Sequence, residues 1–196
     1  MVRTLFLLGA ALAPAVLSAA RVPWPFDMRI EACRAAGGRY VVQTTGAVFE
    51  VRPDRGEVAF SQRIGAQRVV GRLAIPPDLL RGLRRTSRRA EKVCLEAESG
   101  LRLDVHSDSV LRLRGPRPIG LRIAGVFRPE YLRDGQGAAL ALDEHGGFGV
   151  FFLEDIPVHP RVQQSRRGCV LTYDLAADSE LLLCVCPPRE YDWKRD

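Results

Sequence analysis

The chain has 196 residues, of which 29 are Lys or Arg and 23 are Asp or Glu, so its formal net charge is +6. A basic chain invites a nucleic-acid partner. Its only lysines, however, are Lys92 and Lys194, and its arginines are spread along the chain rather than massed on a helix. We therefore expect no nucleic-acid partner.

Residues 1–20 resemble a secretory leader. Arg3 supplies the positive start, Leu5–Leu17 is an apolar run, and Ser18-Ala19-Ala20 offers the small residues at which such leaders are cleaved. The run is too short for a stable membrane span, which needs about 20 apolar residues. An uncleaved N-terminal anchor is the alternative. We expect an exported protein, periplasmic or extracellular, that begins near Arg21.

Residues 21–38 are expected to form an extended lead-in, with a short helical turn at Ile30–Ala36. Strands are predicted at Tyr40–Thr44, Ala47–Val51 and Gln67–Ile75, where apolar residues alternate with polar ones. The turn residues 53–56 (Pro-Asp-Arg-Gly) join Ala47–Val51 to a further strand that contains Val58, Phe60 and Gln62, which predicts a hairpin that spans Phe49–Phe60.

A short helix is predicted over residues 78–85, because Asp78 can cap it and Leu79, Leu80 and Leu83 form an apolar stripe. A basic cluster follows and overlaps it, for which we expect a solvated, mobile loop rather than a polyanion site. Its members are Arg81, Arg84, Arg85, Arg88, Arg89 and Lys92. Inward and outward residues alternate again in Ala90–Glu98, as in a strand, and Cys94, Glu96 and Glu98 are expected to face outward.

Residues 101–114 predict a hairpin whose register can be argued from charge. Pairing Leu103 with Leu113 places Asp104 opposite Arg112 and leaves a three-residue loop. A slip of two residues would instead place Arg102 opposite Arg112, and like charges in opposed positions are destabilising.

A further strand is predicted at residues 119–123, and a polar edge strand at residues 161–166. Residues 138–143 and 148–154 predict a hairpin that is apolar on both faces. The apolar hairpin is expected at the centre of a layered sheet. Together these patterns predict an all-β protein, a large antiparallel β-sandwich (a supersandwich) of about a dozen short strands. The sandwich domain is expected to span residues 39–187, followed by a tail or truncated linker at 188–196.

A last hairpin is predicted for residues 169–174 and 180–186, in which a four-residue loop opposes Cys169 to Cys184. Export permits a disulfide between them, and buried thiols are the alternative. The chain has five cysteines, so at least one thiol has no partner within the chain.

No catalytic motif is evident, and an enzyme is the less favoured expectation. Glu96 and Glu98 on one strand face, together with Tyr131 in a long loop, are the candidate ligand-binding residues. Asp104, His106 and Asp108 alternate at a hairpin tip, where ordinary turn chemistry is favoured over a cation site. We predict no metal site and no cofactor.

Three runs carry a resemblance: Val110–Arg114, the strand Gly120-Leu121-Arg122, and Gly146–Val150. They resemble the large β-sandwich domains, similar to galactose mutarotases, that precede the catalytic barrel in some bacterial glycoside hydrolases. The resemblance covers most of residues 40–186. It implies a non-catalytic accessory or carbohydrate-binding module, with a missing or separate catalytic domain. The alternatives are a small envelope protein that binds a protein partner through a sheet edge or tail, and a mutarotase-like sugar-modifying enzyme.

Overall fold

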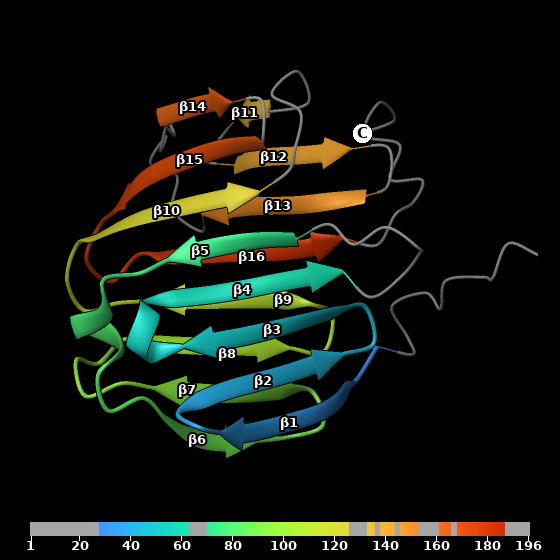
Figure 1. Ribbon diagram of the computed structural model, residues 1–196, viewed down its shortest axis with the longest axis vertical. Coiled ribbons are helices and arrows are strands. Elements are labelled where there is room, and N and C mark those ends of the chain that lie inside the picture. The colour runs from blue at the N-terminus through green and yellow to red at the C-terminus, as the bar shows by residue number, and fades with distance from the viewer. Residues whose placement is uncertain are drawn as a thin grey trace, which may run out of the picture.

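The computed structural model describes residues 28–62, 70–125, 133–135, 138–143, 146–152, 161–165 and 168–186. These residues form two eight-stranded antiparallel sheets that face one another as a β-sandwich (Figure 1). The all-β, antiparallel sandwich expected from the sequence is confirmed.

Sheet A has the strand order β1-β2-β3-β4-β5-β10-β15-β14. Its strands are β1 (Ile30–Ala36), β2 (Arg39–Thr44), β3 (Ala47–Arg52), β4 (Glu57–Gln62), β5 (Val70–Ala74), β10 (Ile119–Gly125), β15 (Gly168–Leu175) and β14 (Arg161–Ser165). Two 3-10 turns, η2 (Pro53–Arg55) and η3 (Pro77–Leu80), lie at one end of the sandwich.

Sheet B has the order β11-β12-β13-β16-β9-β8-β7-β6. Its strands are β11 (Arg133–Gly135), β12 (Ala138–Asp143), β13 (Gly146–Phe152), β16 (Glu180–Cys186), β9 (Val110–Arg114), β8 (Arg102–His106), β7 (Lys92–Glu96) and β6 (Arg84–Arg88). Strands β1 and β6 lie at the same side of the sandwich (Figure 1), where the backbone N–H of Ile30 bonds the carbonyl of Ala90.

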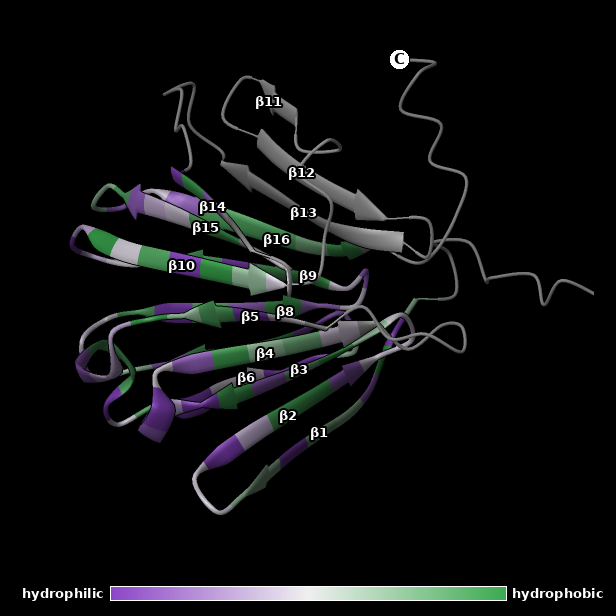
Figure 2. Cartoon of the chain, turned by 45° about the horizontal axis from the view of Figure 1, so that its top comes forward, coloured by the Kyte–Doolittle hydropathy of each residue, from purple (hydrophilic) through white to green (hydrophobic). Residues whose placement is uncertain are grey.

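The core is built from the alternate residues of facing strands. Phe49 on β3 and Leu73 on β5 are fully buried from sheet A, and Leu103 and Leu113 on β8 and β9 are fully buried from sheet B. Figure 2 shows the alternation as polar and apolar bands, for example along β10. One polar contact also crosses the core, because the hydroxyl oxygens of Thr44 and Ser109 lie 2.8 Å apart.

Two predicted hairpins are confirmed residue by residue. Phe49 is paired with Phe60 across β3 and β4, with Gly56 closing the turn in a left-handed conformation at φ 60°. Leu103 is paired with Leu113 and Asp104 with Arg112 across β8 and β9. The predicted polar edge strand is also present, as β14 at the outer edge of sheet A.

Three local predictions are wrong. Ile30–Ala36 is not a helical turn but strand β1, so sheet A begins within the expected lead-in. The helix expected over residues 78–85 is limited to the 3-10 turn η3, because Gly82 at φ 66° leaves the helical conformation and Arg84 starts β6. The basic cluster is therefore not a mobile loop, since it contains the edge strand of sheet B.

The apolar hairpin is present as β12 and β13, with Asp143 paired to Gly146. These strands are the second and third of sheet B rather than its centre, which is occupied by β16 and β9. The predicted leader, the residues up to 27, Tyr131 and the tail at 188–196 all lie outside the described residues.

The predicted final hairpin is wrong. Strand β15 pairs with β10 and β14 in sheet A, where Cys169 is opposite Gly125 and Gln164. Strand β16 pairs with β13 and β9 in sheet B, where Cys184 is opposite Gly149 and Val110. Residues 176–179 thus cross from one sheet to the other, so the register that opposed Cys169 to Cys184 does not exist.

The prediction that β15 and β16 form a hairpin failed because each strand has a complete apolar face. Tyr173 on β15 and Leu183 on β16 are buried from opposite sides of the core. The two strands bury these side chains equally well whether they face one another from two sheets or lie side by side in one. The alternation of apolar and polar residues is the same in both arrangements, so it cannot distinguish them.

Within the part of the chain that the structure describes, no helix is long and apolar enough to cross a membrane.

Candidate functional site

The residues proposed from the sequence do not come together as a site. Glu96 is the last residue of β7, whereas Glu98 lies beyond that strand, in the turn before β8, where its backbone N–H bonds the carbonyl of Arg81. The two carboxylates therefore do not share a strand face. Asp104 lies under basic side chains rather than at a cation site, and the described residues contain no group of His, Cys, Asp and Glu that could hold a metal ion.

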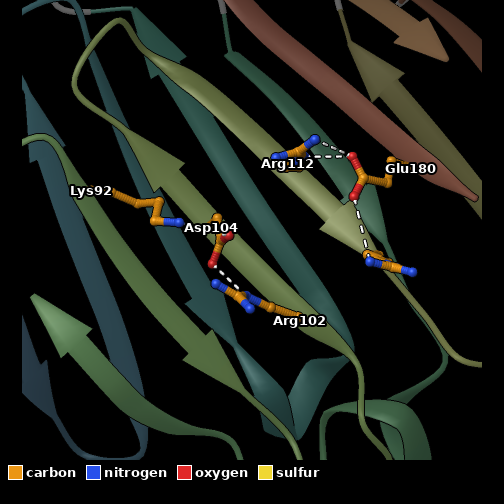
Figure 3. Close-up of a pocket in the computed structure, with 6 residues that line it drawn as sticks. Lys92, Arg102, Asp104, Arg112 and Glu180 are labelled. Atoms are coloured by element: carbon orange, nitrogen blue, oxygen red, sulfur yellow. Dashed lines mark hydrogen bonds and ion pairs between the residues drawn. The ribbon is translucent and has the colours of Figure 1, made fainter. Parts of the chain in front are cut away.

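The strongest candidate is a shallow hollow of about 170 Å³ on the outer face of sheet B, which we call the charged hollow. Four strands supply its lining, namely β7, β8, β9 and β16 (Figure 3). The lining residues are Lys92, Arg102, Asp104, Arg112, Arg114 and Glu180. Four cations thus surround two carboxylates, which leaves an excess of two positive charges.

These side chains share one face because strand alternation and register place them there. Leu103 and Leu113 point into the core, so their neighbours along β8 and β9 point outward. Across the strands, Arg102 is opposite Arg114, and Arg114 is opposite Glu180. A second row on the same face places Asp104 opposite Arg112.

Asp104 is the buried anion of the charged hollow, with only 4% of its surface exposed. Its Oδ1 accepts a hydrogen bond from Arg102 Nε at 3.0 Å, and its Oδ2 lies 3.4 Å from Lys92 Nζ. Burial is the largest influence on its pKa and opposes ionisation. Hydrogen bonds from Arg102 and Cys94, together with the charges of Arg102 and Lys92, outweigh it and lower the pKa.

Glu180 is the second anion. Its Oε2 accepts a hydrogen bond from Arg112 Nε at 2.5 Å, and its Oε1 lies 3.9 Å from Arg114 Nη1 (Figure 3). Asp178 is the other carboxylate near Arg114, also at 3.9 Å. Arg114 is therefore held much more loosely than Arg112.

The direct opposition of Arg102 and Arg114 is the unusual feature of this register. Opposed Cβ atoms in antiparallel strands lie about 4.5–5.5 Å apart, and like charges placed so destabilise the pair. The side chains of Arg102 and Arg114 are 51% and 55% exposed, so both are open to solvent. An oxyanion between them would relieve the repulsion.

This arrangement suits binding better than acid–base catalysis. A general acid needs a pKa raised toward the working pH, whereas the pKa of Asp104 is lowered. Guanidinium groups held by carboxylates offer fixed donors, and Asp104 and Glu180 offer acceptors beside them. The charged hollow can therefore recognise a polar ligand that presents hydroxyl or oxyanion groups.

A second hollow, of about 450 Å³, lies at the end of the sandwich that carries the turns η2 and η3. Pro53, Asp54, Pro77 and Leu80 are among its lining residues. It is wide open, and Asp78 at its rim is already ion-paired with Arg117. We therefore consider it the weaker candidate.

Sequence reasoning missed the charged hollow although one signal was available. The register that opposes Asp104 to Arg112 also opposes Arg102 to Arg114, because opposed positions in a hairpin have a constant sum. Glu180 could not be placed, since β16 was expected beside β15 rather than β9.

No protein-family model matches the chain, and no curated protein matches it in sequence.

Proposed function

We propose that this protein is an exported, non-catalytic β-sandwich module that binds carbohydrate through the charged hollow. One observation carries the proposal, namely the ordered set of Arg, Asp and Glu side chains on an exposed sheet face. Sugars present many hydroxyl groups, each of which can donate and accept a hydrogen bond. Guanidinium donors beside carboxylate acceptors complement that chemistry.

The rigidity of the platform supports a binding role. Eight inward side chains of the four strands that line the hollow are fully buried, at 0% exposure. They are Val93, Leu95, Leu103, Val105, Leu111, Leu113, Leu181 and Leu183. A preorganised surface loses little conformational entropy on binding, which favours affinity for a flexible ligand.

The resemblance to galactose-mutarotase-like domains remains part of this proposal, and its support is the class of fold: two large antiparallel sheets packed face to face. Export rests on the leader-like residues 1–20. N-terminal sequencing of protein from the native host is expected to start at or near Arg21. Full-length chains recovered from the cytoplasm would contradict export.

The binding test is affinity electrophoresis and calorimetry against a panel of neutral and acidic polysaccharides. Arg112→Gln removes the guanidinium that is bonded to Glu180 and is expected to weaken binding about tenfold, the equivalent of one charge-assisted hydrogen bond. Arg52→Gln is the matched control, because Arg52 forms a similar pair with Glu50, at 2.7 Å, on sheet A. If the panel contains no ligand, or both variants bind alike, the proposal is wrong.

The edge strand β6 is the observation that favours the alternative, a protein partner bound at a sheet edge. Among the strands that the structure describes, its backbone pairs with β7 alone, so its other side can accept an added strand. However, β6 carries arginines and an irregular register between Arg85 and Ser87, and such features protect edges from strand addition. A mutarotase-like enzyme is less favoured, because the described residues that line the charged hollow include neither histidine nor an aromatic residue.

A further inference from the structure

A line of arginines extends from the edge of sheet B into the charged hollow. The register places Arg84 on β6 opposite Glu96 on β7, and Glu96 opposite Arg102 on β8. Arg102 is in turn opposite Arg114 on β9. We call Arg84, Arg102 and Arg114 the arginine row. Neighbouring strands are about 4.8 Å apart, so the row spans three spacings, about 14 Å.

Two of the three arginines of the row, Arg84 and Arg114, are poorly neutralised by the described residues of the protein. Among the described residues, the carboxylates nearest to Arg114 lie 3.9 Å away. Arg102 has an anion close by, since its Nε donates to Asp104 at 3.0 Å, and its Nη2 lies 3.7 Å from the sulfur of Cys94. Arg84 is exposed and forms no ion pair with the residues that the structure describes.

The outer face of sheet A provides the contrast. Arg39, Arg52 and Arg72 lie on β2, β3 and β5, and each has a carboxylate oxygen within 3.6 Å. On sheet A, Glu50 and Glu57 thus lie close to all three arginines, two of which are as exposed as those of the row. On sheet B, Arg102 has Asp104 at 3.0 Å, but Arg114 has carboxylates at 3.9 Å and Arg84 forms no ion pair with the described residues. The difference points to an anion supplied from outside.

We propose that the carbohydrate ligand is an acidic polysaccharide, whose carboxylate or sulfate groups bind Arg84 and bridge Arg102 and Arg114. This inference rests on the proposed function and specifies its ligand. A group with two or more oxygens can accept hydrogen bonds from both guanidinium groups at once, which turns their repulsion into a binding contribution.

The charges that interrupt the row favour a polysaccharide over a nucleic acid. In strand order the outward residues are Arg84, Glu96, Arg102, Arg114 and Glu180, so two carboxylates lie among three arginines. Glu96 and Glu180 can accept hydrogen bonds from sugar hydroxyls that lie between the acidic groups of the ligand. A backbone with a phosphate at every nucleotide would place negative charge against both carboxylates.

The test measures affinities, at fixed ionic strength, for four probes: polygalacturonate, dextran sulfate, neutral dextran and a single-stranded oligonucleotide. Arg84→Gln and Arg114→Gln are each expected to weaken binding of an acidic polysaccharide about fivefold to tenfold. Arg122→Gln is the matched control, because Arg122 is an exposed arginine on β10 of sheet A. It is expected to change affinity less than twofold. Polygalacturonate and dextran sulfate distinguish carboxylate from sulfate as the bound group.

Different outcomes separate this inference from the proposed function. If neutral polysaccharides bind as well as acidic ones, or the two row variants bind like the wild type, the inference fails while carbohydrate binding stands. If no polysaccharide binds, the proposed function fails as well. An oligonucleotide that binds as tightly as the acidic polysaccharides, or an equal loss in Arg122→Gln, would show unspecific attraction to the net charge and overturn the arginine row as a carbohydrate site.

Discussion

Replacing Phe60 with alanine is expected to lower the free energy of unfolding by about 3–5 kcal/mol. Phe60 is 1% exposed on β4 and opposes Phe49, which is fully buried on β3. Its ring also fills the space above Gly71 of β5, where an added Cβ would lie 2.1 Å from the Phe60 Cζ. Truncation would therefore open a cavity between three neighbouring strands of sheet A. Urea denaturation followed by circular dichroism measures the change.

Two further variants control for this effect. Val48→Ala shortens an outward side chain on β3 and is expected to cost less than about 1 kcal/mol. Gly71→Ala alone should clash with the Phe60 ring, so the double variant with Phe60→Ala should be less destabilised than the sum of the two single changes. A loss below about 1 kcal/mol in Phe60→Ala would contradict the described core.

Replacing Asp104 with asparagine is expected to destabilise the protein by about 1–2 kcal/mol at neutral pH, with a loss that shrinks in acid. The carboxylate is 4% exposed and bonded to Arg102 and Lys92, but Arg102 is half exposed, so solvent reduces the penalty. The pKa of Asp104 is lower in the folded chain than in the unfolded one. The unfolded chain therefore takes up a proton first as the pH falls, and the stability that Asp104 contributes is lost progressively below about pH 5, as the pH approaches the lowered pKa of the folded chain.

The measurement is a series of denaturation curves between pH 7 and pH 2.5 for the wild type and Asp104→Asn. Asp174→Asn is the matched control, because the ion pair of Asp174 with Arg161 is exposed on both sides, at 75% and 77% of the side chain. It should leave the stability unchanged within about 0.5 kcal/mol. A constant difference between wild type and Asp104→Asn at every pH would refute the role given to the carboxylate.

The pairing of strands that are neighbours in the sequence was predictable, because the residues that determine it lie in the strands and in the turn between them. Turn residues at 53–56 and 107–109 fix short loops, and the alternation on either side leaves one register that keeps the apolar face inward. The prediction of a helical turn at Ile30–Ala36 failed because its own sequence does not determine its structure. Its apolar residues favour no period, and only pairing with β2 decides that the segment is a strand.

Turn residues and strand alternation were enough to establish that this chain forms a β-sandwich, where most of its strands run, and which residues of β8 and β9 are opposed. The placement of β15 and β16 in different sheets, with β16 beside β9, follows only from long-range packing in the folded chain. Every core strand presents the same kind of apolar face, so apolar patterning cannot choose among long-range partners. The charged hollow depends on that choice, because Glu180 meets Arg112 from 68 residues away.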